Sequence, residues 1–194
     1  MSFYINHPSE WIGVPEYWPY PQADGPDLET SHQWVSMLVD ELAELDATFG
    51  DPEREHVTSV LTLAAQRSES TGERCYVAFE SWSGAAYIVA TSTFSSQQLE
   101  GRSLAQHLGA EETGNLAETA VEPFDTESGV TGLRYYRYLV YDASIGSLYG
   151  RADYGFEKAG AVLTLTAAEL DLDYFRKLLP LMEKLAAGVS WNEA

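Results

Sequence analysis

The sequence predicts an α+β protein in which an antiparallel β-sheet has helices packed mainly on one face. Three observations predict this class. Apolar residues recur every three or four positions over residues 30–68 and again after residue 171, which is the period of an amphipathic helix. Over residues 74–166 the period is two, as in strands. The links between the last three predicted strands are short, and short links join antiparallel neighbours.

The chain of 194 residues has the length of one domain, and we expect residues 1–194 to form a single one. Its expected parts are an irregular arm (1–29), a helical hairpin (30–68), and a sheet with a C-terminal helix (73–191).

The arm is expected to be irregular because proline blocks helix and central strand. Its prolines and glycine are Pro15, Pro19, Pro21, Gly25 and Pro26, interleaved with Trp11, Tyr17, Trp18 and Tyr20. The aromatic side chains must leave water, which favours an arm packed on the rest of the chain. A proline-rich ligand for another domain is the alternative.

The helical hairpin has recognisable start signals. Thr30 with Gln33 forms a capping-box pattern, and the first helix is expected over 31–48. Its apolar stripe is Trp34, Met37, Leu38, Leu42, Leu45 and Phe49. Asp51 as the N-cap and Pro52 at the first helical position predict a second helix over about 52–67.

The predicted strands cover residues 74–82, 85–94, 115–124, 130–141, 147–156 and 161–166. Residues 97–108 are expected to be a short helix or loop. The last amphipathic helix runs from Leu172 to Gly188, and Pro180 inside it is expected to kink or split it. The residues expected in the core are Trp34, Leu38, Leu42, Phe79, Tyr87, Leu163, Leu165, Phe175, Leu179 and Met182.

The formal net charge is −19, from 30 acidic and 11 basic residues. A phosphate backbone or an anionic lipid surface repels such a protein, so we expect no nucleic-acid and no membrane partner. No Lys or Arg precedes Arg54. The charge is either a solubility feature or a docking surface for a basic partner.

No catalytic grouping is found, and we expect no catalytic residues, no metal and no cofactor. The four histidines lie in different predicted elements: His7, His32, His56 and His107. The lone cysteine, Cys75, allows no internal disulfide and is expected to be a small buried hydrophobe. The N-terminus lacks the pattern of a signal peptide, and no apolar run has the length of a membrane span, so we expect a cytoplasmic protein.

Arginine and tyrosine concentrate on two neighbouring strands. Alternation places Tyr135, Arg137 and Tyr141 on one face, and Arg134, Tyr136 and Tyr138 on the other. Arg and Tyr are frequent in interface hot spots. The candidate interface, for a homo-oligomer or a protein partner, is Tyr135, Arg137, Tyr141, Tyr149 and Arg151. The alternative is ordinary cross-strand pairing with acids such as Asp153.

Residues 73–191 resemble the Mog1/PsbP-like superfamily, including actinobacterial LpqN-type proteins. The resemblance is carried by the hairpin of residues 76–94, the strands 134–140 and 161–166, and the closing helix running into Gly188-Val-Ser-Trp191. The helical pair 30–68 departs from that pattern. The resemblance implies a binding accessory, an assembly factor or a chaperone without catalysis, and it carries over no catalytic residue.

Three functions therefore stay open from the sequence. The first is a non-enzymatic protein-binding, adaptor or chaperone-like module. The second is an acidic immunity-type inhibitor that neutralises a basic toxin by matching its charge. The third is a small-molecule binding protein or enzyme with a pocket between sheet and helix.

Overall fold

The computed structural model describes residues 2–23, 25–111, 116, 120–142 and 146–193. The chain falls into two compact units, residues 10–88 and residues 1–9 with 89–194. The expectation of a single domain stays a prediction.

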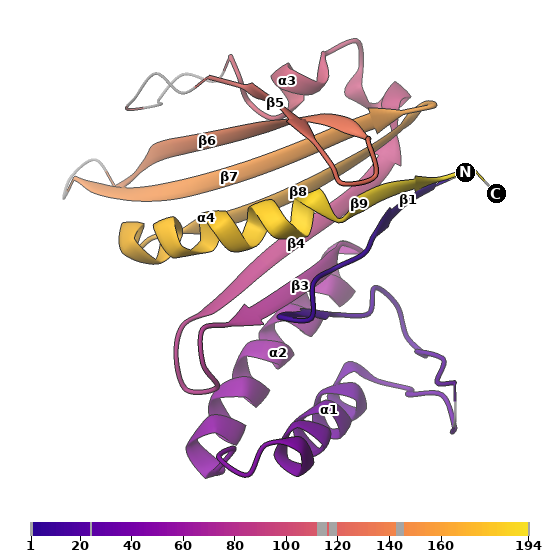
Figure 1. Ribbon diagram of the computed structural model, residues 1–194, viewed down its shortest axis with the longest axis vertical. Helices are drawn as coiled ribbons and strands as arrows, with labels where there is room; N and C mark the ends of the chain where they lie inside the picture. The colour runs from indigo at the N-terminus through magenta and orange to yellow at the C-terminus, as the bar shows by residue number, and fades with distance from the viewer. Residues whose placement is uncertain (1, 24, 112–115, 117–119, 143–145, 194) are drawn as a thin grey trace. The chain divides into compact units, whose positions relative to one another are not determined.

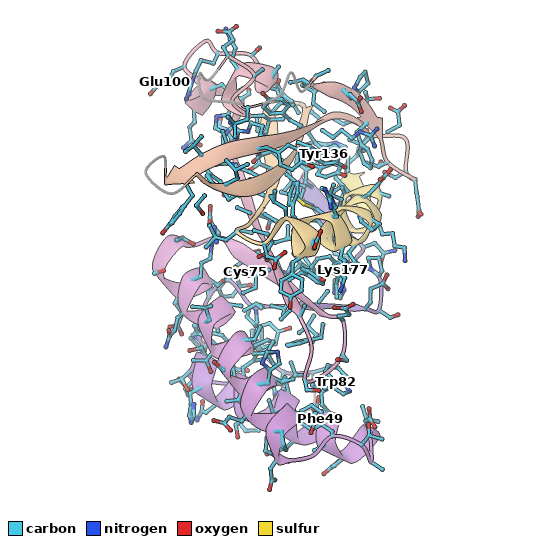
Figure 2. All side chains as sticks on the ribbon, turned by 90° about the vertical axis from the view of Figure 1, so that its left-hand side faces the viewer. Phe49, Cys75, Trp82, Glu100, Tyr136 and Lys177 are labelled. Carbon is cyan, nitrogen blue, oxygen red and sulfur yellow. The ribbon has the colours of Figure 1, made fainter. Side chains whose placement is uncertain are left out.

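The unit of residues 10–88 contains two helices and a pair of short strands (Figure 1). Helices α1 (Ser31–Leu45) and α2 (Asp51–Thr71) form the expected hairpin. Strands β2 (Trp11–Gly13) and β3 (Arg74–Phe79) are antiparallel. In Figure 2 the rings of Phe49 and Trp82 lie together, with centroids 5.7 Å apart in an edge-to-face contact.

The capping box that starts α1 is confirmed. Thr30 Oγ1 accepts from the Gln33 backbone N–H at 3.3 Å, and Gln33 Oε1 accepts from the Thr30 N–H at 3.2 Å. The helix ends at Leu45, three residues before the expected end. Asp46 follows as its C-cap and accepts from Thr48 and from Trp82, so these hydrogen bonds hold the pKa of Asp46 below its usual value.

Three expectations for this hairpin were wrong in detail. Leu45 is 84% exposed, because the helix ends there and its last turn no longer follows the apolar stripe. The N-cap of α2 is Gly50 and not Asp51, which begins the helix. The helix continues to Thr71, beyond the expected residue 67.

The arm contains more regular structure than expected. Besides β2, strand β1 (Ser2–Ile5) pairs with β9 (Val189–Asn192) in the unit of residues 1–9 and 89–194, so the expectation of an irregular segment 1–29 was wrong there. The proline-rich part packs on α1, as expected. The rings of Trp18 and Trp34 are 6.4 Å apart, and Gln22 Nε2 lies 2.8 Å from Met37 Sδ.

The second unit is built on an antiparallel sheet with the order β4-β8-β7-β6-β5 (Figure 1). Its strands are β4 (Ala86–Ser95, entering this unit at Val89), β5 (Glu122–Asp125), β6 (Thr131–Asp142), β7 (Ser147–Lys158) and β8 (Ala161–Glu169). The α+β class with an open antiparallel sheet is thereby confirmed. The strand expected over 115–124 is described only as β5, and residues 115 and 117–119 lie outside the described residues.

Helix α4 (Leu172–Ala187) covers one face of this sheet, alongside β7 and β8 (Figure 1). Asp171 caps it by accepting from the N–H groups of Asp173 and Tyr174 at 2.8 and 3.2 Å. The helix is one continuous element through Pro180, so the expected split did not occur. The other face carries the 3₁₀ turn η1 (Ser96–Leu99) and the short α3 (Leu104–His107).

Most of the expected core is buried: Trp34, Tyr87, Leu163, Leu165, Phe175 and Met182. The residues that are only half-buried are Leu38, Leu42, Phe79 and Leu179. Val39 and Leu178, each next to one of these in the sequence, take the fully buried helix positions instead. None of the helices in the described part of the chain is long and apolar enough to cross a membrane.

Candidate functional site

Strands β6 and β7 direct alternate side chains to opposite faces of the sheet, as the sequence predicted. Arg134 lies 3.4 Å from Glu183 of α4, and the Tyr138 ring contacts Phe175 of the same helix. The even-numbered side chains therefore face α4. Tyr135 and Arg137 belong to the opposite face, which contains the candidate site.

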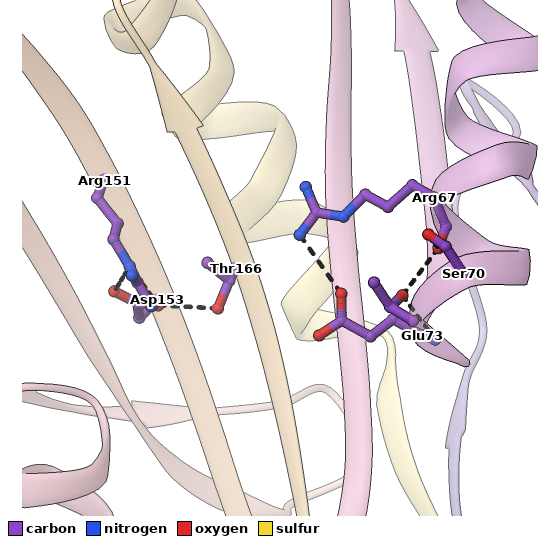
Figure 3. A network of polar contacts seen from close by, with 7 residues as sticks. Arg67, Ser70, Glu73, Arg151, Asp153 and Thr166 are labelled. Carbon is purple, nitrogen blue, oxygen red and sulfur yellow. Dashed lines mark hydrogen bonds and ion pairs between the residues drawn. The ribbon is translucent and has the colours of Figure 1, made fainter.

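A buried ion pair occupies the middle of that face. Arg137 Nη2 lies 3.0 Å from Asp153 Oδ2, and both side chains are only 1% exposed. Arg151 reaches the same carboxylate through Nε and Nη2, each 2.9 Å from one of its oxygens (Figure 3). Thr166 donates its hydroxyl proton to Asp153 Oδ1 at 2.8 Å. One carboxylate thus accepts from three adjacent strands, β6, β7 and β8.

This cluster is the cross-strand pairing that the sequence left as the alternative to an interface. Tyr135 is buried at 2% and Arg137 at 1%, so neither lies on the surface where the interface was expected. Strand alternation assigns a side chain to a face, but it does not say whether that face is covered. The Arg151 side chain is 37% exposed, and Tyr149 is half-buried. Whether Tyr141, Tyr149 and Arg151 contact a partner stays a prediction.

Beyond the ion pair, the ends of β6, β7 and β8 form a pocket of about 450 Å³. It is lined by Val140, Tyr141, Tyr149, Ala168, Glu169 and Leu170. Three of these are large apolar residues exposed to solvent: Tyr141 at 66%, Leu170 at 59% and Val140 at 41%. We call this the strand-end pocket.

Glu169 is the acidic residue of the strand-end pocket. It is half-buried, and removal of water from its carboxyl raises its pKa above the usual value. The negative charge of Asp171, two residues along, raises the pKa further. The described ion pairs do not include Glu169, and the other lining residues carry no positive charge.

The sequence indicated only Tyr141 and Tyr149 of this pocket. Ala168, Glu169 and Leu170 were missed because β8 was expected to end at Thr166, three residues early, and Val140 was missed although it lies within the predicted strand 130–141. The pocket depends on the strand register, in which Leu139 pairs with Tyr149 and Arg151 pairs with Ala168, and the sequence alone does not provide that register.

Burial also shifts the pKa of Cys75 and of His107. Burial raises the pKa of the Cys75 thiol to about 11, consistent with its expected role as a small buried hydrophobe. His107 packs against the Phe94 ring at 5.0 Å, and burial lowers its pKa. Within the described residues, no three His, Cys, Asp or Glu side chains gather where they could hold a metal ion.

Comparison with known proteins gave one solved structure of interest. No protein-family model and no curated protein matches the sequence. A crystal structure of LpqN, described as involved in cell envelope biogenesis of Mycobacterium tuberculosis, is similar over 97% of this chain and 82% of that one. The identity is 12% and the TM-score 0.41. The finding agrees with the LpqN-type resemblance expected from residues 73–191.

Proposed function

We propose that this chain is a non-enzymatic binding module of the cytoplasm that holds a protein partner at the strand-end pocket. The observation that carries the proposal is the group of three exposed large side chains, Val140, Tyr141 and Leu170, around a pocket of about 450 Å³. Exposed apolar groups that gather at a concave surface mark interaction sites.

The exposure of the rim favours a protein over a small molecule. Tyr141 and Leu170 present well over half of their surface to solvent, and a flat partner surface would cover both together with the pocket. Arg151 lies two residues from Tyr149 on the same face of β7 and is partly exposed. Tyr and Arg contribute most to binding when a partner removes water from them.

Site-specific photo-crosslinking tests the proposal. A benzophenone amino acid is placed at Tyr141 and, as a matched control, at Tyr17, which is 67% exposed and lies in the unit of residues 10–88. We expect a discrete protein adduct in native cell extract from position 141 only, suppressed by excess wild-type chain. The same adducts from both positions, or none from position 141, would refute the proposal.

The adduct is then identified and the partner purified. Tyr141→Ala and Leu170→Ala should each weaken its binding by about tenfold or more, the effect of losing a hot-spot side chain. Leu63→Ala is the control, because Leu63 is equally exposed at 61% but lies on α2.

A small-molecule ligand is the second candidate, because the pocket volume lies within the range of about 300–1,000 Å³ that holds such ligands. It predicts that a purified chain binds a low-molecular-weight compound without any protein adduct at position 141.

A further inference from the structure

The lining of the strand-end pocket specifies the chemistry of the group it takes. Resting on the proposed function above, we propose that the pocket receives a lysine or arginine side chain of the partner protein, with its charge against Glu169 and its aliphatic stem against Tyr141, Tyr149 and Leu170.

The charge of the ligand follows from Glu169. This carboxyl is half-buried, and the described ion pairs and the other five lining residues supply no cation for it. A neutral apolar partner would bury the carboxylate without compensation, which costs free energy. An anionic partner would meet Glu169 and the nearby Asp171 with like charge. A cation is the occupant that removes both penalties.

The rest of the lining suits a long basic side chain. Tyr141 and Tyr149 are among the lining residues, and tyrosine rings attract cations, as in the recognition of ammonium groups. Val140, Ala168 and Leu170 offer apolar surface to the methylene groups that connect the charge to the backbone. Lysine and arginine combine a charged end with such a stem.

The charge of the whole chain acts in the same direction. A net charge of −19 attracts a basic partner over a distance and raises its rate of encounter. The net charge therefore attracts the basic partner to the chain, and Glu169 is the residue at which the partner's positive group binds.

The test uses the full chain and three probe peptides of one sequence, with a leucine and a phenylalanine flanking a central residue. That residue is lysine, its uncharged analogue norleucine, or glutamate. We expect the lysine peptide to bind at least tenfold more tightly than the norleucine peptide and the glutamate peptide to be weakest, as measured by calorimetry or fluorescence anisotropy.

Two variants assign the effect to the pocket. Glu169→Gln should abolish the preference for lysine over norleucine. The control is Glu157→Gln, which removes an exposed acid of β7 and should preserve the preference. A circular dichroism melt shows that each variant is folded. Equal binding of the lysine and norleucine peptides, or an unchanged preference in Glu169→Gln, would overturn the proposal.

These outcomes are separable from those of the proposed function. A partner that crosslinks at Tyr141 but binds Glu169→Gln with unchanged affinity leaves the proposed function standing and removes this inference. Butylammonium is a further probe: if it binds as tightly as the lysine peptide, the site takes a small organic cation, and the assignment to a protein side chain fails.

Discussion

Replacing Asp153 by alanine should strongly destabilise the chain. The substitution removes the carboxylate that Arg137 contacts at 3.0 Å, and the Arg137 side chain is 1% exposed. Arg151 and Thr166 lose the same acceptor. Removing one partner of a buried pair costs about 3–5 kcal/mol, because the remaining charge is left in a water-poor site. In a chain of this length the loss corresponds to a fall of roughly 6–20 °C in Tm.

Urea denaturation followed by far-ultraviolet circular dichroism measures this cost. The control is Glu122→Ala, which removes a partner of Arg134 in a pair whose side chains are 53% and 30% exposed. Solvent-exposed pairs contribute less than about 1 kcal/mol, so this control should be nearly neutral. An Asp153→Ala variant no less stable than the control would refute the reasoning that Asp153 is the principal counter-ion of a buried arginine.

Three further predictions concern other side chains. Glu169 has a raised pKa in the folded chain, so the native state favours its protonated form and loses stability as the pH rises through that pKa. Glu169→Gln should therefore stabilise at pH 7 and give no gain near pH 4; absence of a gain at pH 7 in urea titrations contradicts this. Leu178→Ala should cost about 2–5 kcal/mol and Leu179→Ala clearly less, because only Leu178 is fully buried; equal costs would contradict the observed helix phase. Burial that raises the pKa of Cys75 to about 11 should keep its thiol unreactive toward a disulfide reagent at pH 8 until the chain unfolds, and labelling within minutes in native buffer would count against it.

The local periodicity of apolar residues predicted the longer helices and strands, but it could not predict strand pairing between distant parts of the chain. Strand β6 was expected over 130–141 and is observed as Thr131–Asp142. Strand β1 has four residues, and its partner β9 lies at the other end of the chain, with Phe3 opposite Trp191. No pattern within so short a segment signals a partner that far away in sequence.

The same limit applies to the site. Alternation correctly placed Tyr135 and Arg137 on one face, whereas Tyr141 lies at an irregularity of the pairing between Val140 and Asp142. Coverage of that face depends on segments remote in the sequence, such as η1 and α3, whose Leu99 and Leu104 form a cluster with Val162 of β8. Glu169 was missed because alternating polarity fades where β8 ends, although the backbone pairing continues to that residue.

We expect the Asp153 cluster to set the register of the sheet as well as to stabilise it. A slip of β7 by one residue would turn Asp153 toward α4, among side chains such as Phe156 and Phe175 that are fully buried. Arg134 on that face already pairs with Glu122 and Glu183, whereas in the observed register Asp153 has two arginines of its own.

The same register brings Tyr149 opposite Leu139 and Ala168 opposite Arg151, which sets the lining of the strand-end pocket.

Apolar replacement of both members of a buried pair is often neutral for stability, since no charge is left behind. We therefore expect Arg137→Met with Asp153→Leu to be far more stable than Asp153→Ala alone, since the partly exposed Arg151 can turn to solvent. Its backbone amide spectrum should nevertheless show more than one state for Tyr149, because the penalty against a slipped strand is gone. A single set of resonances in the double variant would contradict a register role for Asp153.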